Sequence, residues 1–565
     1  MTSTKRTRRP IVTLLGAVVG LTLILTGSLS ASAASYTRIS GQGSSWAGNA
    51  VAEWVSQVRT QGVTVDYTAA GSSSGRANFA NQTNADFAVS EIPYTGDTAD
   101  PQDSNKPSFG YGMLPVVAGG TSFMYNLQVG GQRFTDLKLS PGSVAGIFSG
   151  AITRWNAPEI VADNPDVALP DQRITVVVRS DGSGATAQFK LWMLRQFPAQ
   201  YAALAAATGM DAAHASSYFP TGSLSNFVAQ NQSQGVTQYT SDTPGTINYD
   251  EYSYAQQVGF PVAQLKNAAG FYTVPDQYAV AVALTQAQIN QEAGPNYLSQ
   301  DLSNVYQYGD PRSYPLSAYS YMLVPTELRG GFTADKGATL AYFNQYALCE
   351  GQRTMGALGY SPLPMNLILA AMEQVAKIPG IDEATLATIT ATRDGVLHGG
   401  ANPCNSPTFQ PGDDVSHNVL IDTAPFPAGC DAACQAPWRL AGSGVGVGGP
   451  TFETDATAVA GGGSGAPAAT DNAAAAGGPA NAGTTAAKSC DADTGVCASD
   501  DATLAGANVK AIPTVIGGQQ GWAGPQTLMT LVGLLLVTLL LAPPLVGRIL
   551  SRSSRPSRSS SGAKQ

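Results

Sequence analysis

Residues 174–194 read ITVVVRSDGSGATAQFKLWML. A β-branched apolar run at 174–178 leads into a Gly/Ser loop and then into a helical pattern over 185–194, which predicts a buried strand followed by a helix. The rest of the chain repeats this alternation. Further strands are expected at 63–67, 87–89, 113–117 and 122–125, and further helices at 49–59 and 338–346. Alternating strands and helices predict an α/β fold with mostly parallel sheets.

Composition divides the chain into a folded part and a long tail. Residues 35–401 have aromatic residues throughout, and their number exceeds what one core usually holds, so we expect two lobes. Residues 402–441 form a proline-rich extension that contains cysteines. Residues 442–526 are rich in Gly and Ala and are expected to be a disordered, flexible stalk, because such a composition cannot bury enough apolar surface to offset chain entropy.

Both ends of the chain carry membrane-related signals. Residues 1–34 combine a basic start, an apolar run and small residues, which predicts a secretory signal peptide; the alternative is an uncleaved helix. Residues 527–546 are long and apolar enough for a transmembrane helix. The basic tail at 547–565 has no acidic residue and is expected in the cytoplasm. We therefore expect a single-pass protein of the cell membrane with its folded domain outside the cell.

The net charge of the part between the two ends limits the kinds of molecule that it can bind. The two ends hold nine of the 30 Lys and Arg residues and none of the 39 Asp and Glu residues, so the part between them carries 21 basic against 39 acidic residues. A domain this acidic is not expected to bind nucleic acid or an anionic lipid surface. An anion site in it must work through local dipoles and hydrogen bonds.

Six cysteines in an exported chain indicate disulfides rather than metal ligands. Chain order suggests Cys349–Cys404, Cys430–Cys434 and Cys490–Cys497, one of fifteen possible arrangements. The three histidines lack metal-ligand spacing, so we expect no metal and no cofactor.

Three Gly/Ser-rich segments next to predicted strands are candidate anion loops. They are Gly41-Gln42-Gly43-Ser44-Ser45-Trp46, Gly71-Ser72-Ser73-Ser74-Gly75-Arg76, and Arg179-Ser180-Asp181-Gly182-Ser183-Gly184-Ala185-Thr186. Backbone amides at a helix N-terminus favour an anion, and an arginine fork can bond two of its oxygens. The alternatives are ordinary helix caps for the first two segments and a structural salt bridge from Arg179 to Asp181 or Glu91 for the third.

Taken in order, these segments resemble the phosphate-binding proteins of ABC importers. Further matching segments are Ala145-Gly146-Ile147-Phe148-Ser149-Gly150 with Arg154-Trp155-Asn156, Pro244-Gly245-Thr246-Ile247 with Tyr252, and Gly359-Tyr360-Ser361-Pro362-Leu363-Pro364. The resemblance covers roughly residues 38–378. It implies a two-lobed periplasmic-binding-protein fold of type II, with crossing strands between the lobes, that closes on inorganic phosphate and meets an importer permease. We expect a monomer.

The resemblance also assigns site residues. It implies phosphate contacts from Ser45, the backbone at Trp46, Ser72, Glu91, Arg179, Ser183, Gly184 and Ala185.

Two of these positions depart from the family pattern. Glu91 stands where the family has Asp, and Ala185 stands where it has Thr, so we expect Ser180 or Thr186 to supply the missing hydroxyl. An ionised carboxylate here accepts a hydrogen bond from a protonated phosphate oxygen. Sulfate has no such proton at neutral pH and would face an uncompensated negative charge, which discriminates between the two anions.

Two other functions remain open. A secreted phosphatase or serine hydrolase is one, because Gly71-Ser72-Ser73-Ser74-Gly75 fits the letters of a nucleophile motif, although His214 and His398 lie in no recognisable triad. A surface protein that has lost its ligand is the other.

Overall fold

The computed structural model describes residues 36–94, 106–399, 401–430 and 434. Two main sheets organise this part of the chain. The first has the order β12-β4-β17-β3-β1-β2 and the second the order β10-β9-β11-β5. In the first sheet the strands are β1 (Ile39–Gly43), β2 (Val65–Thr68), β3 (Phe87–Ser90), β4 (Tyr111–Ser122), β12 (Asp250–Glu251) and β17 (Ser317–Pro325). In the second they are β5 (Tyr125–Asn126), β9 (Thr175–Arg179), β10 (Phe227–Gln230) and β11 (Thr246–Asn248).

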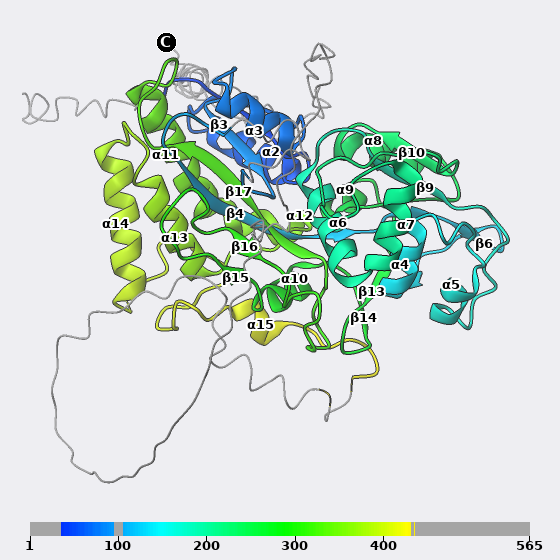
Figure 1. Ribbon diagram of the computed structural model, residues 1–565. Helices are drawn as coiled ribbons and strands as arrows, with labels where there is room; N and C mark the ends of the chain where they lie inside the picture. The colour runs from blue at the N-terminus through cyan, green and yellow to red at the C-terminus, as the bar shows by residue number, and fades with distance from the viewer. Residues whose placement is uncertain (1–35, 95–105, 400, 431–433, 435–565) are drawn as a thin grey trace, which may run out of the picture. The chain divides into compact units, whose positions relative to one another are not determined.

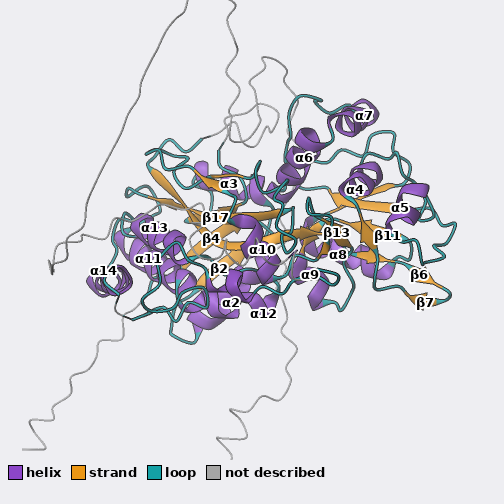
Figure 2. Cartoon of the chain, turned by 90° about the horizontal axis from the view of Figure 1, so that it is seen from below, coloured by secondary structure: helices purple, strands orange, loops and turns teal. Residues whose placement is uncertain are grey.

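Helices connect and cover these strands. Around the first sheet lie α2 (Gly48–Arg59), α3 (Ser72–Ala80), α10 (Gln277–Leu284), α11 (Ala334–Leu348), α12 (Met355–Leu358), α13 (Met365–Val375) and α14 (Glu383–Leu397), with a 3-10 turn at Glu350–Thr354. Around the second lie α4 (Pro141–Phe148), α5 (Pro158–Asp163), α6 (Gly184–Gln196), α7 (Pro198–Thr208) and α8 (Gln232–Asp242). Helix α9 (Tyr252–Gln257) lies between α8 and the strands β4 and β12 of the first sheet. Figures 1 and 2 both place β4 and β17 in one group of elements and α4 and α8 in another. We call these groups lobe 1 and lobe 2.

Small sheets complete the fold. One has the order β14-β13-β8, with β8 (Lys138–Leu139), β13 (Gln264–Lys266) and β14 (Tyr272–Thr273). Two hairpins pair β6 (Gln128–Val129) with β7 (Gln132–Arg133), and β15 (Gln288–Ile289) with β16 (Gln300–Asp301).

The chain crosses between the two main sheets twice. After β4 it enters the second sheet at β5, and after β11 it returns to the first sheet at β12. The two crossings lie together, because β12 pairs with the end of β4 and the hydroxyl of Ser122 donates to the carbonyl of Asp250 at 3.0 Å. This confirms the crossing strands that the family resemblance implies.

Strand direction corrects one expectation. The second sheet is mostly parallel, since β9 pairs in parallel with both β10 and β11. The first sheet is parallel only from β2 through β1 to β3, and its other pairs, β3-β17, β17-β4 and β4-β12, are antiparallel. The expectation of mostly parallel sheets was therefore wrong for half of the first sheet. There the paired strands are separated by long segments of the chain and run in opposite directions.

The structure corrects the bounds expected for two strands at 113–117 and 122–125. The second strand is the short β5, which begins only at Tyr125. The first strand is β4, which runs without a break through Gly119 and Gly120 as far as Ser122. A Cβ at Gly119 would lie 2.7 Å from the Trp46 ring, and one at Gly120 would lie 3.1 Å from the Tyr314 ring. These glycines make room for aromatic rings that pack on the strand, so they do not mark its end.

The proline-rich extension packs on lobe 1. Cys349 at the end of α11 is disulfide-bonded to Cys404, and the hydroxyl of Thr408 donates to the carbonyl of Leu363 at 2.8 Å. Helix α15 (Val419–Thr423) lies against α10, as Figure 1 shows. The Cys349–Cys404 and Cys430–Cys434 pairings are confirmed. The Cys490–Cys497 pairing lies outside the described residues.

One histidine, His417, connects two parts of the proline-rich extension. The ring nitrogens of His417 lie 2.9 Å from Asp413 and 2.7 Å from Asp422. Burial disfavours the charged imidazolium, but hydrogen bonds and ion pairs with the two carboxylates outweigh it and raise the pKa of His417 above its usual 6.5. A raised pKa means that the folded state binds this proton more tightly than the unfolded state does.

We expect the stabilisation by His417 to depend on pH. It is fully present below pH 6.5 and is lost as the pH rises through the raised pKa. The difference in melting temperature between the wild type and His417→Gln should therefore be larger at about pH 5.5 than at about pH 8.5. His398→Gln is the control, because among the described residues the ring of His398 forms a hydrogen bond with the carbonyl of Asp394 and with no carboxylate. A difference that does not change with pH would contradict the assignment.

The membrane-related segments and the stalk fall outside the described part. The expected signal peptide at 1–34, the stalk at 442–526, the transmembrane helix at 527–546 and the tail at 547–565 all lie there. Within the described ranges, no helix has the length and apolar character needed to cross a bilayer.

Candidate functional site

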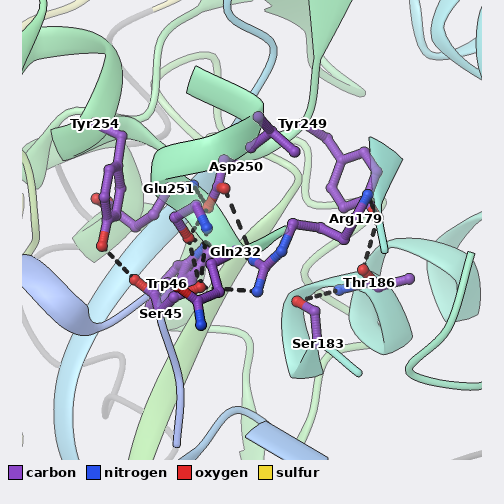
Figure 3. Close-up of polar contacts among 12 residues, drawn as sticks. Ser45, Trp46, Arg179, Ser183, Thr186, Gln232, Tyr249, Asp250, Glu251 and Tyr254 are labelled. Atoms are coloured by element: carbon purple, nitrogen blue, oxygen red, sulfur yellow. Dashed lines mark hydrogen bonds and ion pairs between the residues drawn. The ribbon is translucent and has the colours of Figure 1, made fainter. Parts of the chain in front are cut away.

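The candidate site lies at the facing edges of the two main sheets. Because the carboxyl ends of the parallel strands β1, β2 and β3 meet at one edge of the first sheet, the segments that follow them bring Ser45, Ser72 and Glu91 together. Arg179 is the last residue of β9 in the second sheet, and α6 begins five residues later. Figure 3 shows Ser45 and Arg179 pointing toward one another from these two lobes.

The guanidinium of Arg179 organises the site. Its side chain is 1% exposed. Its Nε and Nη2 donate to the two carboxylate oxygens of Asp181 at 2.9 and 2.5 Å. Nη2 also donates to the hydroxyl of Ser45 in lobe 1 at 2.8 Å, while Nη1 lies 3.3 Å from Ser233 Oγ and 3.8 Å from Asp250 Oδ2. The ion pair with Asp181 is present, as the structural alternative required, but the other edge of the guanidinium faces the opposite lobe.

Electrostatics keep the Arg179–Asp181 pair charged. Burial disfavours both charges, yet the attraction and hydrogen bonds between the partners outweigh it. The pKa of Arg179 is raised, and the pKa of Asp181 is lowered. The backbone N–H of Gln232 adds a hydrogen bond of 2.7 Å to the Asp181 carboxylate. A guanidinium held in this way keeps a fixed orientation and can bind two oxygens of an oxyanion with its remaining N–H groups.

Glu91 is the acceptor on the lobe 1 side. It is 1% exposed, and hydroxyl groups surround its carboxylate. Ser44 and Ser320 donate to Oε1, the latter at 3.0 Å, and Ser72 donates to Oε2 at 2.7 Å. The extra methylene relative to aspartate is accommodated in this hydroxyl cradle. Ser72 is therefore hydrogen-bonded to Glu91. Of the two salt bridges considered for Arg179, the one to Asp181 is present and the one to Glu91 is not.

The N-terminus of α6 supplies backbone donors. Ser183 caps the helix and accepts from the N–H of Thr186 at 3.3 Å. Gly184 and Ala185 occupy the first turn, where N–H groups have no intrahelical acceptor. A Cβ at Gly184 would lie 2.5 Å from Glu91 Oε2 and 3.0 Å from Ser72 Oγ, so only glycine allows the two lobes to approach this closely.

Trp46 and Ser45 are anchored by tyrosines. Tyr360 donates to the carbonyl of Trp46 at 2.7 Å, and Tyr254 donates to the carbonyl of Ser45 at 2.5 Å. The Trp46 ring is buried and packs edge-on against Tyr360. These contacts hold the turn that precedes α2 and so fix the position of the Ser45 hydroxyl.

The two residues expected to supply the missing threonine hydroxyl, Thr186 and Ser180, differ in their surroundings. Thr186 Oγ1 lies 2.6 Å from the hydroxyl of Tyr249 and is used there. Ser180 is exposed. A further hydroxyl at the site belongs to Ser233 in the first turn of α8, whose Oγ lies 2.9 Å from Ser45 Oγ.

Sequence reasoning missed four residues of the site: Ser44, Ser233, Asp250 and Ser320. Ser44 is adjacent to a residue that was assigned, and its place in the Gly/Ser loop was a usable signal. The other three come from α8, β12 and β17, elements that carried no loop motif. The positive φ of 60° at Gln232 marks the turn that presents Ser233, but a backbone angle is not readable from the sequence.

The geometry does not assemble a serine hydrolase around Ser72. Its hydroxyl bonds Glu91, whereas His214 bonds Asp211 and His398 bonds the carbonyl of Asp394. Within the described ranges, no group of three or more His, Cys, Asp and Glu residues is arranged to hold a metal ion.

Comparison with known proteins matches the region that builds this site. A family model described as a PBP superfamily domain matches residues 29–350. Phosphate-binding protein PstS 3 of Mycobacterium tuberculosis is 31% identical over 331 residues, which are 58% of this chain and 82% of that protein. Phosphate-binding protein PstS of Xylella fastidiosa is 28% identical over 332 residues, 59% of this chain and 83% of that protein. A high-affinity periplasmic phosphate-binding protein solved with bound phosphate is 20% identical, with a TM-score of 0.47 and coverage of 61% of this chain and 99% of that one.

Proposed function

The chain belongs to the PBP superfamily and, within it, to the phosphate-binding proteins, and from this premise we propose that it captures inorganic phosphate between its lobes and delivers it to an ABC-type phosphate importer. The observation that carries the proposal is the guanidinium of Arg179. It is buried, oriented by Asp181 and aimed at lobe 1. That arrangement suits a small tetrahedral oxyanion held by both lobes.

Closure of the two lobes explains how binding is transmitted. Arg179 and Ser233 of lobe 2 contact Ser45 of lobe 1, and the N–H of Ser73 in lobe 1 donates to the carbonyl of Gly182 at 3.1 Å. A phosphate that bonds both sets of residues favours the closed arrangement. Closure then presents a surface from both lobes that a permease can distinguish from the open form. The family consists of binding proteins, and we propose that this chain acts as a monomer without catalytic turnover.

We further propose that the protein is exported and tethered. The signal at 1–34 and the apolar segment at 527–546 support a single-pass protein with its lobes outside the cell and its basic tail in the cytoplasm. The Gly/Ala-rich segment between them supports a flexible tether. Protease treatment of intact cells tests this arrangement. It should remove the lobes and leave the tail protected, and loss of both would refute the proposed orientation.

Calorimetry with phosphate and sulfate tests the proposed function. We expect one phosphate per chain and much weaker binding of sulfate, because the carboxylate of Glu91 can accept a hydrogen bond from a protonated phosphate oxygen and sulfate has no such proton at neutral pH. Glu91→Gln replaces that acceptor by a group that can also donate. The affinity for sulfate should rise by about tenfold or more, since an uncompensated acceptor costs about 1–3 kcal/mol.

Two further variants make this result decisive. Glu91→Asp restores the family's residue and should keep the preference for phosphate. Glu159→Gln alters an exposed glutamate of α5 and should change neither affinity. Equal binding of the two anions by the wild type, or an unchanged affinity for sulfate in folded Glu91→Gln, would refute the role of Glu91. Absence of phosphate binding by the wild type would refute the proposed function itself.

A further inference from the structure

A carboxyl group that no motif indicated faces Arg179 from the crossing between the lobes. Asp250 begins β12 and is 3% exposed. Its Oδ1 accepts from the hydroxyl of Ser233 at 2.9 Å and from the N–H of Glu251 at 2.7 Å. Its Oδ2 is buried and has no hydrogen-bond partner among the described residues. One oxygen of Asp250 is thus committed and the other is available.

The available oxygen lies at the edge of Arg179 that an anion would use. Asp181 takes Nε and one N–H of Nη2. The outer edge, formed by Nη1 and the other N–H of Nη2, donates to the hydroxyls of Ser233 and Ser45, which an anion bound there would replace as acceptors. Asp250 Oδ2 is 3.8 Å from Nη1, too far for a hydrogen bond but close enough that an oxygen bound to Nη1 would lie next to it. Figure 3 shows Asp250 approaching this edge of Arg179.

The charges around this edge do not balance. Asp181, Asp250 and Glu91 supply three carboxyl groups to a site with one guanidinium facing the anion. A phosphate dianion next to an ionised Asp250 would place two anionic oxygens in contact inside a buried site, which is strongly unfavourable. Protonation of one carboxyl group would relieve this repulsion when phosphate is bound.

Asp250 is the group best placed to carry that proton. Asp181 is held ionised by its paired hydrogen bonds from Arg179, whereas burial raises the pKa of Asp250 to about 6 despite the attraction of Arg179. The other titratable groups that face Asp250 are Tyr249 and Glu251 beside it and Tyr254 on α9. Burial raises the pKa of all three, which favours their neutral forms, and none of them can supply a positive charge. The side chains of α8 and β4 that contact β12 and its Asp250 are uncharged, namely Ser233, Ser122 and Thr121.

We propose that Asp250 takes up one proton from solvent when phosphate binds and that its Oδ2–H group then donates a hydrogen bond to a phosphate oxygen beside Arg179. This inference rests on the proposed phosphate site and adds a second selecting residue to it. Glu91 accepts from the anion on one side, and protonated Asp250 donates to it on the other. Binding is then linked to pH, with affinity falling as the pH rises above the pKa of free Asp250 by up to about tenfold per pH unit.

Proton uptake during phosphate binding tests the proposal directly. Calorimetry in two buffers of different ionisation enthalpy, at a pH well above the second pKa of phosphate, gives the number of protons taken up. We expect the wild type to take up about one proton more than Asp250→Asn. In this variant the hydroxyl of Ser233 and the N–H of Glu251 hold the amide oxygen in the place of Oδ1. The amide NH₂ group then points to the anion and donates to it without needing a proton from solvent.

The possible results distinguish failure of the Asp250 proposal from failure of the proposed function. Phosphate affinity of Asp250→Asn should stay nearly constant between about pH 7 and about pH 9, and Asp242→Asn, an exposed change at the end of α8, should behave as the wild type. Equal proton uptake in Asp250→Asn and the wild type would overturn the proposal, because the proton would then reside on phosphate or another group. Absence of uptake in the wild type would overturn it even if the variant fails to fold. Absence of phosphate binding in the wild type would instead count against the proposed function.

Discussion

Arg179→Ala is expected to abolish phosphate binding at the concentrations that calorimetry reaches. Truncating one partner of a buried, hydrogen-bonded charge typically costs about 2–5 kcal/mol, a loss of roughly 30-fold to several thousand-fold in affinity. For Arg179→Ala the loss of affinity should lie at the upper end of this range. The variant removes the charge that balances Asp181 and Asp250 as well as the donors to the anion.

Two variants separate loss of binding from loss of structure. Arg179→Lys keeps a positive charge but loses the planar fork, so it should bind at least about tenfold more weakly than the wild type. Arg154→Ala removes an exposed ion pair with Asp171 at 2.6 Å and should leave binding unchanged. Unfolding curves recorded alongside show whether each protein is folded. Phosphate affinity that survives in a folded Arg179→Ala variant would refute the site.

Loss of the Cys349–Cys404 disulfide is expected to cause the largest change in stability. The bond closes a segment of 55 residues and ties α11 to the extension. The chain-entropy relation gives about 4 kcal/mol for a loop of this length. The double variant Cys349→Ala/Cys404→Ala should therefore unfold at a clearly lower urea concentration or temperature under non-reducing conditions.

The second disulfide provides a matched control. Cys430 and Cys434 are only four positions apart, so the same relation gives roughly half the stabilisation for Cys430→Ala/Cys434→Ala. Equal losses in the two double variants would show that loop length does not determine the effect. Phosphate binding should persist in both variants while they are folded, because neither disulfide contributes a residue to the site.

Much of the fold could be predicted from local pattern. The strand at 174–178 and the helix after it appear as β9 and α6, and the helix expected at 49–59 appears as α2. Patterns of this kind reflect interactions between residues a few positions apart, which alternation and helical periodicity report directly. The strand expected to end at 117 instead continues as β4 to Ser122, and the second strand, β5, begins only at Tyr125. Gly119 and Gly120 lie within β4 because Trp46 and Tyr314, which are far away in the chain, pack closely on them.

The candidate site likewise contains residues that local pattern indicates and residues that only tertiary contacts reveal. Arg179, Ser183 and Gly184 could be assigned because one loop carries a guanidinium, a helix cap and a close-approach glycine together. Ser233 and Asp250 could not, because each is an unremarkable residue within its own segment. Their roles depend on contacts with Arg179 that span 54 residues or more.

The sequence by itself determined an α/β chain with Gly/Ser loops at strand ends and an arginine fork beside one of them. Only the tertiary structure decided that the fork is shared between Asp181, Ser45 and the edge where Asp250 lies. The physical reason is that strands and helices follow from short-range backbone and side-chain preferences. The residues that surround the buried Arg179 come from distant segments of the chain. The two crossings between the sheets bring these segments together, and the packing of the whole described fold sets where they meet.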